Sequence, residues 1–193
     1  LERADFAPLD PWIELIFDRV GQRPAFVSAA DELAAVSSTM IATLYRQPLH
    51  ARFSVLAQRT RALIEEEVGV NQKVAAAVFL LNYYNWTGDT VGARELVGII
   101  RPLLSHPELT PLRRASWELR LAIHYLIAGE FPMTLAALSV ATSIAQVNGF
   151  AMIEVNALLF ETLLYLCEAD TTRAEAALLL VAARLNPARR LDL

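Results

Sequence analysis

Apolar positions along the chain recur three and four residues apart, in stretches separated by glycine, proline or polar turn residues. This spacing places the apolar side chains on one face of an α-helix, and no stretch alternates as a half-buried strand does. The pattern predicts helices over about 10–20, 28–47, 50–68, 71–88, 90–105, 110–129, 131–148, 151–168 and 171–186. We therefore expect an all-α protein of about nine helices.

Glycine and capping residues mark the predicted helix ends. Five of the seven glycines fall there: Gly21, Gly69, Gly88, Gly129 and Gly149. The other two, Gly92 and Gly98, lie inside one predicted helix and suggest close backbone approach. The residues expected to open helices by capping free amides are Asp10, Ser28, Asn71, Asp89, Thr110, and Asp170 or Thr171. In the first helix, the predicted apolar stripe is Trp12, Ile13, Ile16, Phe17 and Val20.

A tyrosine and a small residue recur together along the chain. The tyrosines Tyr45, Tyr84, Tyr125 and Tyr165 are separated by 39, 41 and 40 residues. A small residue follows each tyrosine by nine positions: Ser54, Ala93, Thr134 and Ala174. A period near forty with one helical hairpin per period is typical of a stacked α-solenoid, here of about four hairpins. The alternative is that four tyrosines recur by chance in an all-helical chain.

The length of 193 residues suits one sizeable domain with its own core. We interpret residues 1–193 as a single helical-repeat domain, with an N-terminal capping helix in 1–27 and the repeats in 28–193. Because the sequence begins with Leu1, we interpret it as a piece of a larger protein.

Composition narrows the class of protein. Hydrophobic residues make up 55% of the chain, largely Ala and Leu, which favour helices. The longest apolar runs, 74–81 and 176–183, are shorter than the roughly 20 residues of a membrane span. The net charge of −4 gives no basic footprint for nucleic acid. Cys167 is the sole cysteine, so no disulfide forms within the chain, and we expect it to be a small buried hydrophobe. We expect a cytoplasmic protein without membrane or direct nucleic-acid contact.

No motif for catalysis, a cofactor or a metal stands out. Gly-rich phosphate loops and a G-x-S-x-G elbow are absent from the sequence, and no histidine has a partner at metal-ligand spacing. Glu154 and Glu161 are seven apart on one helix face, and His124 lies on an apolar helix. An enzyme fragment built on these three residues is one alternative, but a solvated or ion-paired face explains them more simply. We expect a non-enzymatic protein with no cofactor.

Three predicted turns resemble those of tetratricopeptide repeats. They are TGDTVGA (87–93), AGEFPMT (128–134) and EADTTRA (168–174). That family places an aromatic residue four before the turn glycine and a small residue five after it. The chain departs from the family in its period of about 40 rather than about 34 and in the irregular residues early in each first helix (Ser38, Ala77, Glu118, Leu158). The resemblance implies a right-handed α-solenoid.

Residues 71–89 and 93–103 are also similar to the helical effector domain of bacterial transcriptional regulators of the MalT and SARP type, which are signal-transduction ATPases. This resemblance implies a protein-interaction or ligand-sensing domain of a multidomain regulator. Its partner would be a protein or a small-molecule effector, and it could form a homo-oligomer. The alternative is a structural scaffold or self-association module unrelated to transcription.

In tetratricopeptide stacks, first-helix residues that face the inner groove bind the ligand. The matching positions here are Arg46, Gln47, Asn82, Asn85, Trp86, Ile123 and Ile127. An indole beside amides offers contact area with directional hydrogen bonds. The later repeats continue the groove with apolar residues, including Leu126, Leu163 and Leu166, which form either a hydrophobic groove or a face covered by a helix or another subunit. Val78 stands where peptide-carboxylate-binding members carry Lys, so that binding mode is not expected.

Overall fold

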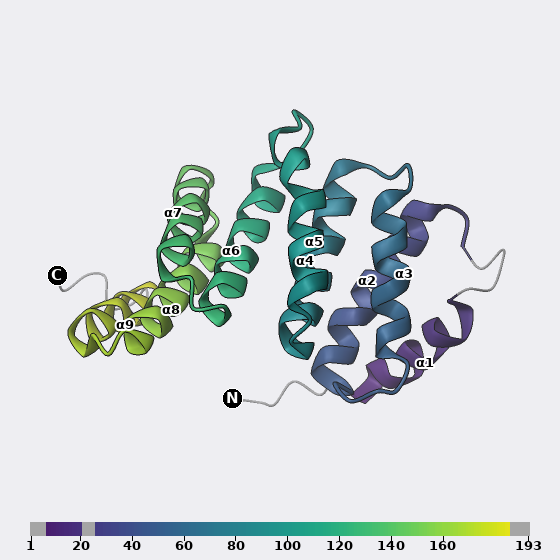
Figure 1. Cartoon of the computed structure of the whole chain (residues 1–193), viewed down its shortest axis with the longest axis horizontal. Coiled ribbons are helices and arrows are strands. Elements are labelled where there is room, and N and C mark those ends of the chain that lie inside the picture. The colour runs from purple at the N-terminus through teal and green to yellow at the C-terminus, as the bar shows by residue number, and fades with distance from the viewer. Residues whose placement is uncertain (1–6, 21–25, 186–193) are drawn as a thin grey trace. The chain divides into compact units, whose positions relative to one another are not determined.

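The computed structural model describes residues 7–20 and 26–185, which form nine α-helices and two short 3-10 helices without any strand (Figure 1). The elements are η1 (Ala7–Leu9), α1 (Asp10–Arg19), α2 (Ala29–Arg46), α3 (Phe53–Glu65), α4 (Val70–Thr87), α5 (Thr90–Ile100), η2 (Arg101–Ser105), α6 (Pro111–Ile127), α7 (Phe131–Asn148), α8 (Ala151–Cys167) and α9 (Thr171–Leu185). The predicted all-α class is confirmed. None of these described helices is long and apolar enough to cross a membrane.

The contacts group the chain into two compact units, Leu1–Leu109 and Thr110–Leu193. The boundary falls between the second and third predicted hairpins.

In the first unit, α1 packs on α2, and two hairpins, α2–α3 and α4–α5, lie against each other. Helix α4 contacts both α2 and α3, so the second hairpin is stacked on the first. The fully buried side chains of this unit are mostly aliphatic and include Leu33, Val36, Met40, Leu56, Leu63, Leu80 and Leu96. Burial of one face of each helix supplies most of the stability of such a hairpin, because short helices are marginal alone.

The second unit repeats this arrangement with α6–α7 and α8–α9. Helix α8 contacts both α6 and α7, as α4 contacts α2 and α3. Its central cluster combines two leucines with four alanines: Leu119, Ala122, Ala137, Leu138, Ala141 and Ala157. Alanine gives good helix propensity and lets neighbouring helices approach closely. Stacked hairpins are therefore present within each unit, and a continuous solenoid through both remains a prediction.

The turns of the last three hairpins share one backbone geometry. The amide donors at Asp89, Glu130 and Asp170 reach the carbonyl oxygens of Tyr84, Tyr125 and Tyr165 over 3.0, 2.9 and 2.8 Å. The residue before each donor has a left-handed backbone, with φ of 73° at Gly88, 74° at Gly129 and 58° at Ala169. Such bonds satisfy carbonyl groups that the helix end leaves open. The small residues that follow, Ala93, Thr134 and Ala174, are buried. The predicted register is confirmed for these three repeats.

The first repeat departs from this register. Tyr45 is 75% exposed, Ser54 is exposed, and Leu49, at the place of the turn glycine, is 93% exposed. The connection after α2 packs instead on α1: the His50 ring stacks on Phe17 with centroids 4.1 Å apart. Arg52 also donates to the Phe17 carbonyl and pairs with Asp18 at 3.1 Å. The prediction of a fourth equivalent turn is wrong here, because this loop holds the N-terminal helix.

Two of the predicted caps are wrong. Leu9 occupies the N-cap of α1 without a side-chain bond, and Asp10 instead pairs with Arg46. Gly69 is the N-cap of α4, and the Asn71 side chain donates to the Glu108 carbonyl. The other predicted caps accept amide hydrogen bonds: Ser28, Asp89, Thr110 and Asp170.

Several single residues also differ from expectation. Trp12 is 65% exposed, and Cys167 is exposed at the end of α8 rather than buried. The helix predicted over 90–105 ends at Ile100 and continues as η2, because Pro102 lacks the N–H that an α-helical turn needs. A Cβ at Gly98 would meet nothing within 4 Å, so no close approach exists there. Gly21 lies outside the described residues.

Candidate functional site

The seven predicted groove residues fall into two groups. Arg46, Gln47, Asn82, Asn85 and Trp86 belong to the first unit, at the ends of α2 and α4. The remaining two, Ile123 and Ile127, belong to the second unit, on α6.

Arg46 and Gln47 hold α1 onto α2. The Arg46 Nε and Nη2 atoms donate to the two carboxylate oxygens of Asp10 over 3.1 and 2.8 Å. This two-pronged geometry is the strong form of an arginine–carboxylate pair. The hydrogen bond from Arg46, with a further one from Gln47, holds the pKa of Asp10 below its ordinary value. Both side chains therefore bind a carboxylate of the chain itself, Asp10, which is a role that the sequence pattern did not predict.

The end of α4 presents an indole. Trp86 lies in the last turn of α4 and is 63% exposed. Asn82, one helical turn before it, and Asn85, the residue next to it, are partly buried. The exposed ring offers a large apolar area with one N–H donor. The prediction that these three residues bind a ligand stays a prediction, now limited to this end of α4.

The apolar groove residues predicted in the second unit are exposed or partly exposed to solvent. Ile127 is 63% exposed, whereas Ile123 and Leu126 are partly buried. On α8, Leu163 and Leu166 are 47% and 54% exposed. Helices of this unit thus present an apolar surface to solvent.

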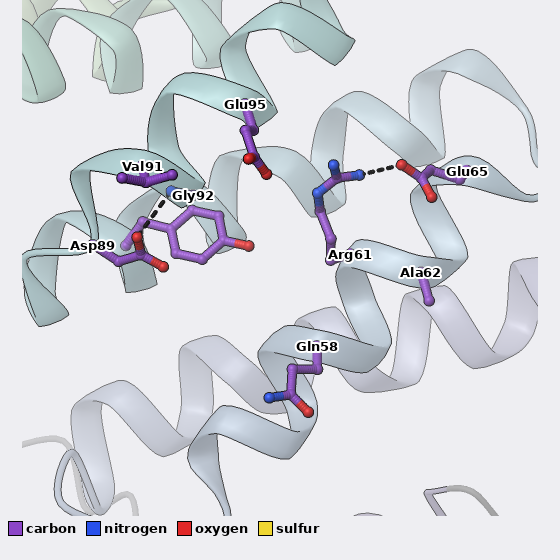
Figure 2. A pocket seen from close by; sticks show the side chains of 9 residues that line it. Gln58, Arg61, Ala62, Glu65, Asp89, Val91, Gly92 and Glu95 are labelled. Atoms are coloured by element: carbon purple, nitrogen blue, oxygen red, sulfur yellow. Dashed lines mark hydrogen bonds and ion pairs between the residues drawn. The ribbon is translucent and has the colours of Figure 1, made fainter.

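A pocket that the sequence did not suggest lies between α3 and the α4–α5 turn (Figure 2). It has a volume of about 510 Å³ and is lined by Gln58, Arg61, Ala62, Glu65, Tyr84, Asp89, Val91, Gly92 and Glu95. Figure 2 shows the α3 side chains on one wall and Asp89, Val91 and Glu95 on the other. Helix packing alone joins segments some thirty residues apart, so no local motif marks the pocket. The one sequence signal was Gly92, where close backbone approach was expected; the structure instead places the side chains of Tyr84 and Asp89 against it.

The charged groups of the pocket differ in the hydrogen bonds and ion pairs that they form with the chain. The Arg61 Nη1 atom lies 2.5 Å from Glu65 Oε1, one helical turn along α3. Asp89 Oδ1 accepts the Gly92 amide over 2.8 Å and so caps α5. Glu95 forms no hydrogen bond or ion pair within the described part of the chain.

Tyr84 adds an aromatic ring to the same pocket. Burial raises the pKa of its phenol; Arg61 opposes this shift, and Asp89, Tyr83 and Glu95 add to it. The phenol therefore lies in the electrostatic field of the pocket's charged groups. A Cβ at position 92 would come within 2.9 Å of Tyr84 Cε1 and 2.6 Å of Asp89 Oδ2. The glycine keeps the ring and the carboxylate together at the turn.

The two carboxylates considered for acid–base chemistry, Glu154 and Glu161, are both at least partly buried. Glu154 is nearly buried and pairs with Arg184 at 2.5 Å, joining α8 to α9. Burial raises the pKa of Glu161 above its ordinary value and likewise that of Glu118, where Arg114 opposes the shift. Among the described residues, no three His, Cys, Asp or Glu side chains lie close enough to hold a metal ion.

Comparisons of the chain with family models, with curated proteins and with solved structures found no match. The resemblances to tetratricopeptide repeats and to the effector domains of transcriptional regulators therefore stay predictions from the sequence.

Proposed function

We propose that this chain is a non-enzymatic helical-repeat domain that binds a protein or a small-molecule effector. The observation that carries the proposal is the single hairpin turn repeated near Gly88, Gly129 and Ala169, with hairpins stacked in each unit. Stacks of this kind present extended surfaces built from successive helices, which serve for recognition.

The exposed end of α4 is the first surface to test. Tryptophan is the residue type most enriched among those that dominate binding energy, because its ring buries a large area at little entropic cost. Trp86 is 63% exposed, and so is available to a partner. Asn82 stands one turn before it on the same helix.

Replacing Trp86 with alanine is expected to weaken binding of the partner about 30-fold, which corresponds to about 2 kcal/mol. Partners would first be captured with the intact chain from extracts of the source cell, and each would then be purified and titrated by calorimetry. Trp12→Ala is the matched control, because Trp12 is equally exposed (65%) but lies on α1. Equal affinities for the wild type and Trp86→Ala would remove the end of α4 from the binding surface.

The finer proposal is that this domain is the effector-sensing part of a multidomain bacterial transcriptional regulator in the cytoplasm. Its support is the resemblance of residues 71–89 and 93–103 to that group. An effector that binds one arrangement of the repeats better than another would shift their equilibrium and so bias neighbouring domains. A parent reading frame that encodes a nucleotide-binding segment and a DNA-binding segment would support this, and one that encodes neither would overturn it.

A self-association module is the second candidate. Helix α8 exposes Met152, Leu159, Leu163 and Leu166 along one face, and α9 exposes Leu178, Leu179, Leu180 and Leu185. Contiguous exposed apolar surface marks protein interaction sites in many soluble proteins. Sedimentation at rising concentration would show a monomer–dimer equilibrium. A monomer at every concentration would contradict this candidate.

A further inference from the structure

We propose that the pocket between α3 and the α4–α5 turn binds an alkyl guanidinium or ammonium group, carried by a peptide side chain or by a free small amine. The residues that line the pocket do not include Asn82, Asn85 or Trp86 at the end of α4. The two ideas therefore stand or fail separately.

The groups of the pocket that could attract an anion are already engaged by the chain's own acids. Arg61 lies 2.5 Å from the carboxylate of Glu65. The N-terminus of α5, which favours negative charge, is capped by Asp89. An incoming anion would have to displace one of these carboxylates, so the pocket does not suit anions.

The groups that remain suit a cation. Three carboxylates (Glu65, Asp89, Glu95) and one guanidinium (Arg61) line the pocket, which leaves a net formal charge of −2. Glu95 has no partner within the described part of the chain, and the Asp89 cap uses only Oδ1. Hydrogen bonds between a charged donor and a carboxylate are among the strongest in proteins. A donor-rich cation would therefore find carboxylate acceptors on α3 and at the start of α5.

The shape and the aromatic ring favour a cation on an alkyl chain over a bare ion. The volume of about 510 Å³ lies within the range of about 300–1,000 Å³ typical of sites for small organic ligands. Tyr84 offers a π face, which attracts alkylammonium and guanidinium groups. Gly92 keeps this ring beside Asp89, because a Cβ there would crowd both. Ala62 and Val91 supply apolar contact for the alkyl part.

The test is a titration of the whole 193-residue chain with agmatine and with the peptide acetyl-Gly-Arg-Gly-amide, followed by calorimetry and by the NMR shift of the Gly92 amide. We expect at least one of these probes to bind and to shift that amide. Binding of agmatine alone identifies a free amine as the ligand source, and binding of the peptide identifies a basic side chain. The anionic peptide acetyl-Gly-Glu-Gly-amide is expected not to bind.

Charge variants decide the direction of the effect. Glu95→Gln is expected to weaken binding of the cation about 10-fold. Glu175→Gln makes the same change at an exposed position of α9, in the other unit, and is expected to leave binding unchanged. Arg61→Gln is expected to strengthen binding of the cation, because it removes the one positive charge among the described residues that line the pocket. Circular dichroism checks that each surface variant keeps its fold. The proposal is overturned if neither probe binds at millimolar concentration, if Glu95→Gln binds as the wild type does, or if Arg61→Gln abolishes binding.

Discussion

Replacing Leu138 with alanine is expected to lower the free energy of unfolding by about 2–5 kcal/mol. Leu138 is completely buried on α7 within the cluster that joins α6, α7 and α8. Four of the five other buried residues in this cluster are alanines, whose side chains have no rotamers with which to fill the space left behind. The loss therefore combines the transfer free energy of the removed carbons with the free energy of an unfilled cavity. Urea unfolding followed by circular dichroism measures it.

Val140→Ala is the control for this prediction. Val140 lies two residues further along α7 and is 38% exposed, so its truncation should change the free energy of unfolding by no more than about 0.5 kcal/mol. A loss as large as that of Leu138→Ala would mean that α7 faces the core differently from the structure.

Replacing Ala93 with leucine is expected to destabilise the chain by about 1–3 kcal/mol. Ala93 is 1% exposed in the first turns of α5, which packs on α4. A larger side chain there must push the two helices apart or adopt a strained rotamer. The midpoint of the urea transition gives the size of the loss.

The matched control is Ser54→Leu, at the same place in the sequence repeat. Ser54 is exposed because the first repeat does not share the turn geometry, so leucine should cost no more than about 0.5 kcal/mol there. Equal losses at positions 54 and 93 would contradict the observed difference between the first and second repeats.

The sequence could predict the helices and the later turns because their causes are local. Periodic apolar positions and glycines such as Gly88 and Gly129 define helices that the structure places within a few residues of expectation. The spacing of the tyrosines also predicted the turn at Ala169, where no glycine marks it. Asp89 and Ser28 cap their helices as their side-chain chemistry indicates.

The sequence could not predict what depends on distant contacts. Arg46 lies in a position suited to a groove, but its partner Asp10 stands 36 residues away and only folding brings them together. The same holds for the loop around His50, whose stacking on Phe17 displaces the first repeat from its register. Periodicity assigns Trp12 to a stripe without showing whether another helix covers it.

The candidate site shows the same limit. Each wall of the pocket is an ordinary helix surface in the sequence, with charges such as Arg61 and Glu95 on an amphipathic pattern. Their joint position depends on where α3 and α5 lie in the folded unit, which no residue spacing encodes. The glycine at position 92, which has the side chains of Tyr84 and Asp89 against it, was the only local trace of the pocket.

The central claim is that one hairpin turn repeats about every forty residues from α4 onward, and urea unfolding of four turn variants tests it most directly. A left-handed backbone costs a residue with a Cβ about 1 kcal/mol relative to glycine. We therefore expect Gly88→Ala and Gly129→Ala to lose about 1 kcal/mol and Ala169→Gly to gain up to about that amount, because all three positions have positive φ. Leu49→Gly should bring no gain, since this exposed residue has no left-handed backbone. The repeat would be contradicted if Gly88→Ala and Gly129→Ala left the free energy of unfolding unchanged and Ala169→Gly lowered it.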